Sequence, residues 1–171
     1  MTRRELEITD REEICSILDR TKILHLGLVD DGMPYIVPMN YGYQMDEAGH
    51  LELYLHSSVK GYKMEVIRRN PVCCFELECG VLPFEGELPC QYGTAYSSVM
   101  GRGRLEIVED PAEKMDLMSR FMKSQTGKDF SFNEKLVSIV SVLRLRCSEY
   151  TAKCRPLPAK LREAACEEEA E

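Results

Sequence analysis

The sequence predicts a mainly β domain of the α+β class, in which about six antiparallel strands form a closed or nearly closed barrel with three helices outside. Three observations lead to this prediction. Apolar and polar residues alternate along several short segments, as they do in half-buried strands. Short turns containing glycine and aspartate separate these segments. No strand is followed by a regular crossover helix and the chain has no G-x-G-x-x-G motif, so a Rossmann-type fold is disfavoured.

The first segment predicts one helix followed by a hairpin. Thr9-Asp-Arg-Glu12 has the form of a capping box, so an amphipathic helix is expected at 10–20. Strands are expected at 23–29 and 35–43. Between them, Asp30-Asp-Gly32 is a hairpin signal in which the glycine can supply the positive φ that the turn requires.

A strand that runs into a short basic helix comes next. The turn at 46–49 leads into a strand at 51–55, where leucines alternate with polar residues. A helix follows at 58–70, with Ser58 as the expected N-cap and a proline directly after its end. The next strand, at 72–79, begins with a nearly continuous apolar run that predicts burial on both faces.

The middle of the chain predicts a long loop and then a bent strand. Residues 80–93 contain three glycines and two prolines and are expected to be a loop that is functional or contacts a partner; a disordered insertion is the alternative. Extended structure resumes at 96–109. Gly101 and Gly103 suit a strongly bent barrel strand or the close approach of a ligand, and a plain β-bulge explains them equally well.

The last third predicts a well-defined helix, a strand and a tail. Asp110-Pro-Ala-Glu113 places aspartate at the N-cap, proline at the first helical position and glutamate at N3. A final strand is expected at about 136–153. We therefore expect a single domain at 1–155 and a flexible acidic C-terminal tail at 156–171.

Composition excludes several function classes. The formal net charge is −7 and the pI is about 5.1, which argues against nucleic acid or a membrane surface as the main partner. No apolar run approaches the roughly 20 residues needed to span a bilayer, and no signal-peptide region is seen, so a cytoplasmic protein is expected. Its eight cysteines are then expected to be reduced. A zinc site built from Cys73, Cys74, Cys79 and Cys90 is a remote alternative because its spacing is wrong.

The joint between the strand at 51–55 and the following helix predicts an anion site. The first-turn N–H groups, the positive end of the helix dipole and the hydroxyls of Ser57 and Ser58 would converge there with Lys60 and Lys63. A capped surface helix with solvated lysines is the competing interpretation. The local excess of positive charge in an acidic protein favours the anion site.

Three blocks of sequence, in this order, resemble the pyridoxamine 5′-phosphate oxidase-related FMN-binding split barrels, and in particular their nitroimidazole-resistance (Nim) branch. The blocks are Gly27-Leu-Val-Asp-Asp-Gly-Met-Pro-Tyr-Ile-Val-Pro-Met-Asn-Tyr-Gly42, then Leu55-His-Ser-Ser-Val-Lys-Gly-Tyr-Lys63 with Arg69-Asn-Pro-Val-Cys73, and Tyr96-Ser-Ser-Val-Met-Gly-Arg-Gly103. The chain has no tryptophan and no counterpart of the C-terminal Trp and Arg elements of true pyridoxamine phosphate oxidases, which argues against vitamin B6 oxidation.

This resemblance implies a six-stranded antiparallel split β-barrel that forms a homodimer, with FMN in each of two interface clefts. Members of the family place the flavin phosphate near the positions of Ser57, Lys60 and Lys63, and the same corner contains Ser58 and Gly61. The implied ring and ribityl contacts, some from the opposite subunit, are Pro38, Met39, Asn40, Tyr41, His56, Ser97 and Ser98. No metal ligands are implied.

The implied activity is that of a flavin-dependent oxidoreductase that reduces a small acceptor, such as a nitroimidazole, with a nicotinamide donor. Tyr41, Tyr96 and His56 would line the cleft, and His56 is the candidate catalytic proton donor because its ordinary pKa lies near 6.5. A histidine that merely ends a strand is the competing interpretation for His56. The alternative functions are a flavin or haem carrier, with His25 or His56 as haem ligand, and a dimerisation module with an empty site.

Overall fold

The computed structural model describes residues 4–161, and its centre is one eight-stranded antiparallel sheet. The strands are β1 (Glu7–Ile8), β2 (Ile23–Asp30), β3 (Met33–Asn40), β4 (Gly42–Met45), β5 (Leu51–Ser58), β6 (Val72–Phe84), β7 (Gly93–Val108) and β8 (Val140–Arg155). Their order across the sheet is β3-β2-β6-β7-β8-β5-β4, and β1 pairs with β8. The split-barrel α+β class is confirmed, but with eight strands in place of the predicted six.

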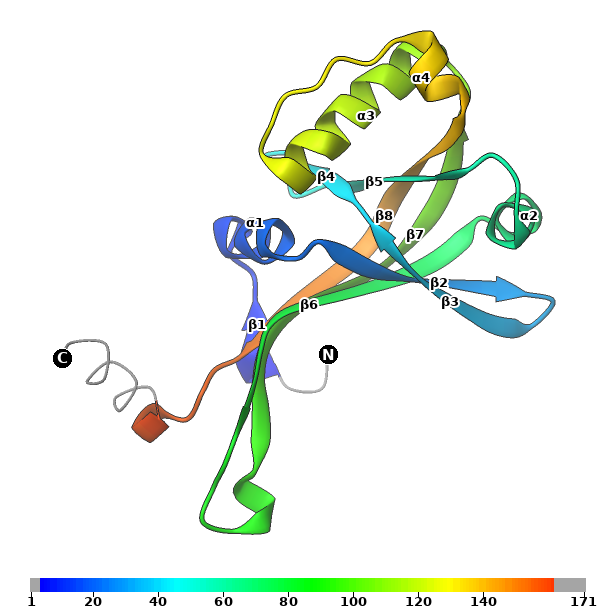
Figure 1. The fold of residues 1–171 in the computed structure, drawn as a ribbon. Helices are drawn as coiled ribbons and strands as arrows, with labels where there is room; N and C mark the ends of the chain where they lie inside the picture. The colour runs from blue at the N-terminus through cyan, green and yellow to red at the C-terminus, as the bar shows by residue number, and fades with distance from the viewer. Residues whose placement is uncertain (1–3, 162–171) are drawn as a thin grey trace.

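The sheet bends back on itself because its two edge strands are consecutive in the chain (Figure 1). Only Tyr41 separates β3 from β4, and the sequence predicted one strand over 35–43. The Tyr41 side chain is buried, and its hydroxyl donates to the carbonyl of Leu18 at 2.8 Å. This anchor turns the chain from the β2 side of the sheet to the β5 side. The short β1 is the other strand that sequence patterns did not indicate.

Within residues 4–161, the sheet is flanked by four α-helices of at least five residues, in place of the three predicted. They are α1 (Arg11–Arg20), α2 (Tyr62–Arg69), α3 (Pro111–Thr126) and α4 (Glu134–Ser138), with short 3₁₀ turns at Arg4–Leu6 and Pro89–Gln91. Asp110 caps α3 as predicted, by accepting from the Glu113 amide at 2.8 Å. In α1 the cap is Asp10, not Thr9, because the Asp10 carboxylate accepts from the Glu13 amide at 2.9 Å.

Two further boundaries differ from the prediction. The strand expected from residue 136 starts at Val140, because Asn133 caps α4 by accepting from the Leu136 amide at 3.0 Å. Helix α2 starts after Gly61 rather than after Ser58. Strand β5 extends through Ser58 because the ladder to β8 continues up to that residue.

The expected loop at 80–93 is mostly an extension of the sheet. Strands β6 and β7 continue as a hairpin as far as the pair Phe84 and Gly93, with an irregularity between Cys79 and Leu82. Figure 1 shows this hairpin projecting from the body of the molecule. It carries exposed apolar side chains, namely Val81, Leu82, Leu88 and Tyr92.

Strand β6 has one buried and one exposed face, so the prediction of burial on both faces is wrong. Cys73, Phe75 and Leu77 point into the core, whereas Cys74 is exposed. Because neighbouring side chains of a strand point to opposite faces, Cys73 and Cys74 cannot join one tetrahedral zinc site. The seven cysteines among the described residues are free thiols.

The apolar core lies on the inner face of the sheet, and a second cluster lies under α3. The main core includes Leu24, Leu26, Leu53, Leu77 and Leu145. The second cluster includes Tyr54, Val108, Leu117, Phe121 and Val142. From residue 4 to residue 161, no helix is long and apolar enough to cross a membrane. The predicted acidic tail lies outside the described residues from position 162 onward.

Candidate functional site

The joint between β5 and α2 leaves the start of the helix without a side-chain cap. The Ser58 hydroxyl donates to the carbonyl of Lys60 at 2.7 Å, which tightens the turn. Gly61 follows with φ 132°, a conformation that favours glycine, and α2 begins at Tyr62. No side chain accepts a hydrogen bond from the first turn of α2. The Met64 N–H donates to the Gly61 carbonyl at 3.0 Å, so among the described residues the N–H groups of Tyr62 and Lys63 and the positive end of the helix dipole are available to an anion.

Three of the four basic residues at this joint have no acidic partner among residues 4–161, and two of the three are lysines. Arg69 pairs with Asp30, and Arg68 donates to the carbonyl of Val59 at 3.3 Å. Lys60 is exposed and Lys63 is half-buried, and neither takes part in an ion pair of the described chain. Burial lowers the pKa of Lys63 below its ordinary value. A nearby anion would compensate this partly buried charge.

His56 lies beside this cationic corner and has an unsatisfied ring nitrogen. Its ring packs edge-on against Phe121 of α3, with centroids 4.8 Å apart and planes at 80°. The Nδ1 atom is buried and has no hydrogen-bond partner within the described chain. Burial first, and then the charge of Lys63, lowers the pKa of His56 below its ordinary value of 6.5. His56 is therefore mainly neutral at pH 7, so in the cofactor-free protein it is a hydrogen-bonding group more than a proton donor.

Helix α3 connects His56 with the end of β3. Gln125 lies one turn after Phe121 on the same face of α3, and its Nε2 donates to the Tyr41 carbonyl at 2.6 Å. The Asn40 amide donates to the Lys22 carbonyl at 3.0 Å. The structure therefore holds His56 and the 40–41 segment against one helix, although sequence patterns gave no sign that α3 contributes to the site.

The other predicted flavin contacts on and next to β3 differ in how accessible their side chains are to a ligand. Pro38 is exposed and pairs with His25 in the ladder, whereas Met39 is buried. The Tyr41 phenol is committed to the core, and burial raises its pKa. Tyr41 can therefore contribute its backbone to a ligand but is not available as a wall of the cleft.

Three predicted serines do not lie on the face of His56. Ser57 is buried and, as the neighbour of His56 on β5, points to the opposite face of the strand. Ser97 and Ser98 are also buried, and Ser98 pairs with Lys153 of β8, whereas His56 pairs with Val142. At about 3.3 Å per residue, these two β8 positions are about 35 Å apart along the strand. Ser97 and Ser98 are not part of the His56 site within one protomer.

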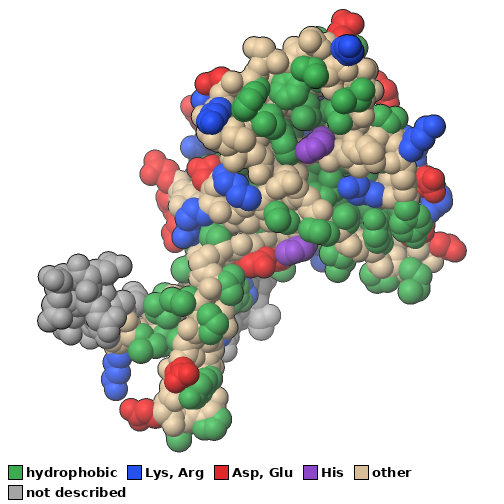
Figure 2. Space-filling model, viewed as in Figure 1, with side chains coloured by type: hydrophobic (Ala, Val, Ile, Leu, Met, Phe, Trp, Pro, Cys, Tyr) green, Lys and Arg blue, Asp and Glu red, His purple; other side chains and the backbone are tan. Residues whose placement is uncertain are grey.

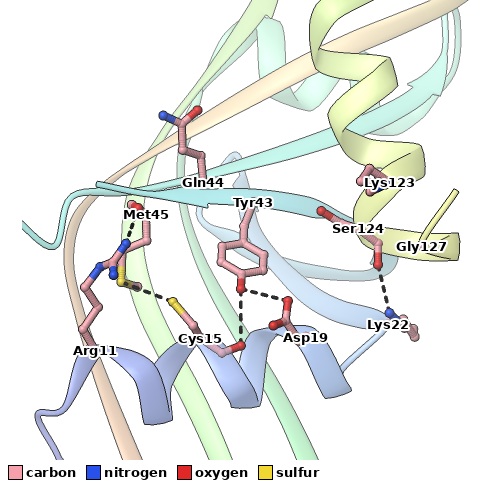
Figure 3. Close-up of a pocket in the computed structure, with 10 residues that line it drawn as sticks. All are labelled: Arg11, Cys15, Asp19, Lys22, Tyr43, Gln44, Met45, Lys123, Ser124 and Gly127. Carbon is pink, nitrogen blue, oxygen red and sulfur yellow. Dashed lines mark hydrogen bonds between the residues drawn. The ribbon is translucent and has the colours of Figure 1, made fainter. Parts of the chain in front are cut away.

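Sequence reasoning missed a pocket of about 600 Å³ between α1, β4 and α3 (Figure 3). The Tyr43 hydroxyl donates to Asp19 Oδ1 at 2.8 Å, and the Arg11 side chain donates to the carbonyl of Met45 at 3.1 Å. Lys22 Nζ donates to the Ser124 carbonyl at 2.9 Å. These polar groups are already bonded to protein, unlike His56 Nδ1. The lining comes from three distant segments, so no local pattern could reveal it.

The His56 corner, defined by His56, Lys60, Gly61 and Lys63, fits the polar parts of a flavin mononucleotide. Its donor set consists of uncapped helix N–H groups and two lysines without acidic partners, which suits a phosphate dianion. The buried, unpartnered His56 Nδ1 requires a further polar partner. Both requirements would be met by one ligand that carries a phosphate at one end and a polar ring at the other.

The lowered pKa of His56 predicts how the stability of the protein depends on pH. Because the folded-state pKa lies below 6.5, the unfolded state binds more protons between the two pKa values, so stability rises with pH in that window. Denaturant unfolding of the cofactor-free protein should show stability falling as pH drops below about 6.5. His56→Phe should reduce this slope. Equal slopes for wild type and His56→Phe would contradict the burial of His56.

Fold and site together define a split-barrel protein with a candidate phosphate-binding corner. The pyridoxamine 5′-phosphate oxidase family model matches residues 10–154, and the chain belongs to that family. No match was found among curated proteins.

Solved structures extend this comparison. A proposed 5-nitroimidazole antibiotic resistance protein from Bacteroides thetaiotaomicron is similar at 33% identity and a TM-score of 0.74, over 87% of this chain and 86% of that one. The flavocytochrome Anf3 from Azotobacter vinelandii shares the fold at 22% identity and a TM-score of 0.74, over 90% and 71% of the two chains. A FAD and haem binding protein from Mycobacterium smegmatis also shares the fold, at 21% identity and a TM-score of 0.72, over 93% of this chain and 79% of that one. The resemblance to the family and to its nitroimidazole-resistance branch is confirmed.

Proposed function

We propose that the protein is an FMN-binding flavoprotein that acts as an oxidoreductase on a small acceptor. The buried, unpartnered Nδ1 of His56, next to the charge of Lys63, is the observation that carries this proposal. Family membership and the similarity to proteins described as binding flavins support it. The phosphate would lie at the uncapped start of α2 and the flavin ring beside His56.

FMN, when bound, supplies hydride or electron transfer, and the protein supplies position and electrostatics. Lys60 and Lys63 hold the phosphate with charge-assisted bonds, together with the first-turn N–H groups after Gly61. Neutral His56 would orient the flavin ring through a hydrogen bond at Nδ1, which has no partner among the described residues. Phe121, packed edge-on against the imidazole, helps to hold it in place. Binding of the anionic phosphate would raise the His56 pKa and thereby favour proton donation to a reduced product.

We further propose that two copies of the chain complete the site. Ser97 and Ser98 lie far from His56 in one protomer, so their implied flavin contacts require a second one. The protomer also exposes large apolar side chains on the edge and outer face of the sheet, which a partner would cover: Met33, Ile36, Val72 and Met100. Figure 2 shows hydrophobic and histidine side chains together on the face viewed. Light scattering should give the mass of a dimer, and a monomer that retains FMN would contradict this arrangement.

The acceptor we favour is a nitro-heterocycle, because the similar Bacteroides protein is described as a candidate 5-nitroimidazole resistance protein. The purified protein, titrated with FMN, should bind one equivalent per protomer and show a flavin spectrum. It should then oxidise NADH or NADPH faster when a nitroimidazole is present. Flavin binding without any such stimulation would indicate a carrier, and a Soret band in place of the flavin spectrum would indicate a haem protein.

A further inference from the structure

Three side chains with metal-binding atoms converge on the outer face of the sheet, and one of them is His25, which the sequence suggested as a haem ligand. His25 lies on β2 and Glu76 and Glu78 lie on β6. His25 and Glu76 are direct partners in the β2–β6 ladder. Glu78 follows two residues later and therefore points to the same face as Glu76. Two paired strands, and not a flexible loop, thus fix the three side chains relative to one another.

The distances within this cluster suit a single ion. His25 Nδ1 lies 3.3 Å from Glu76 Oε2 and 3.8 Å from Glu78 Oε2. One ligand atom from each of the three residues lies within 4.8 Å of the other two. Atoms that bind one zinc ion at about 2.0–2.2 Å are separated by similar distances, so small side-chain rotations suffice to place a cation between them.

The charges of the cluster favour a cation as well. Two carboxylates face one imidazole, so the cluster is negative whether or not His25 is protonated. No lysine or arginine of the described chain forms an ion pair with Glu76 or Glu78. Two neighbouring carboxylates of one strand repel each other, and a divalent ion removes that repulsion.

We propose that His25, Glu76 and Glu78 form a site for a divalent transition-metal ion of the zinc class. One imidazole and two carboxylates are ligands that suit Zn²⁺ and Co²⁺ and leave a coordination position for water or a small ligand. His25 and Glu76 also line a hollow of about 890 Å³ on this face of the sheet. In the protomer the open position therefore lies at the edge of this hollow, whose lining includes Ile36 and Met100, two of the residues that a partner subunit would cover.

The test is titration of the full-length, tag-free protein with Co²⁺ after chelation of residual metal. We expect one equivalent of Co²⁺ to give d–d absorption bands of nitrogen and oxygen ligation, and Zn²⁺ to displace it. His25→Ala and Glu78→Gln should each weaken Co²⁺ binding by at least about tenfold, since even outer-shell partners of a metal ligand contribute 10–100-fold to affinity. Circular dichroism of each variant checks that it is folded before its affinity is compared.

Controls distinguish this site from other metal ligands of the chain. His50 pairs with Asp46 at 2.7 Å and belongs to no group of three such ligands within residues 4–161, so His50→Ala should leave Co²⁺ affinity unchanged. Cys74→Ser should also leave it unchanged, because Cys74 is exposed on the same face of β6 but lies outside the cluster. An intense thiolate-to-cobalt charge-transfer band, the absence of Co²⁺ binding, or equal affinity in folded His25→Ala would each overturn the proposal.

Discussion

The double variant Lys60→Ala/Lys63→Ala is expected to bind FMN at least about 100-fold more weakly than the wild type. Each substitution removes one charge-assisted contact to the phosphate, and such bonds contribute about 1.5–3 kcal/mol. Lys60 is exposed, so its contribution should fall at the lower end, whereas half-buried Lys63 should contribute more. A combined loss of about 3 kcal/mol corresponds to about two powers of ten in Kd. Fluorescence titration of the cofactor-free protein with FMN measures this change.

A matched double variant distinguishes the loss of contacts at the phosphate from the effect of changing the net charge on FMN affinity. Lys128→Ala/Lys160→Ala removes the same two charges from exposed positions outside the His56 corner, so its FMN affinity should stay within about threefold of the wild type. Riboflavin, which lacks the phosphate, should bind the Lys60/Lys63 double variant and the wild type equally. If the folded double variant bound FMN as tightly as the wild type, the assignment of the phosphate to the His56 corner would be wrong.

Gly103→Ala is expected to destabilise the fold by about 1–3 kcal/mol, the range of overpacked core positions. A Cβ atom at Gly103 would lie 2.2 Å from the carbonyl oxygen of Arg146. That oxygen belongs to the paired strand β8, next to the point where the β7–β8 register shifts, so neither strand can move without breaking ladder bonds. Denaturant unfolding of the two proteins gives the difference in stability.

The control for Gly103 is a glycine that has space around it. Gly32 has a φ of 82° and no atom within 4 Å of an added Cβ, and asparagine tolerates such a backbone. Gly32→Asn should therefore change stability by less than about 1 kcal/mol. If Gly103→Ala were as stable as Gly32→Asn, the claim that β8 packs too closely on Gly103 to admit a side chain would be contradicted.

The bulge beside Gly103 also decides between the explanations offered by the sequence. Arg102 pairs with Glu149 and Gly103 with Cys147, so Ser148 is the extra residue of a bulge in β8. The glycine is needed because a bulged partner strand approaches it closely. The sequence allowed this explanation but could not choose it, since the bulge lies on the partner strand.

Local signals predicted the elements whose ends are determined locally. The start of α3 at Asp110 depends on one side chain and its own first turn, and it was found correctly. Where pairing with a distant strand sets the boundary, prediction failed. Ser58 has the properties of an N-cap, yet it remains in β5 because β8 pairs with it. The 80–93 segment has the composition of a loop, but β6 and β7 pair far into it.

The same division applies to the candidate site. His56, Lys60 and Lys63 fall within one short segment, so a strand-to-helix joint sufficed to predict that they lie near one another. Phe121 and Gln125 come from α3, far along the chain, and no local pattern connects them with His56. The distance between Ser98 and His56 depends on the register of β8 with both β5 and β7, which only the folded structure provides.

A crystal structure of the protein with FMN tests the central claim most directly. We expect the phosphate within hydrogen-bond distance of Lys60 or Lys63 and of the first-turn N–H groups of α2, and the flavin ring as the partner that His56 Nδ1 lacks. FMN bound elsewhere, with the start of α2 facing bulk solvent and away from any cleft between protomers, would contradict the account.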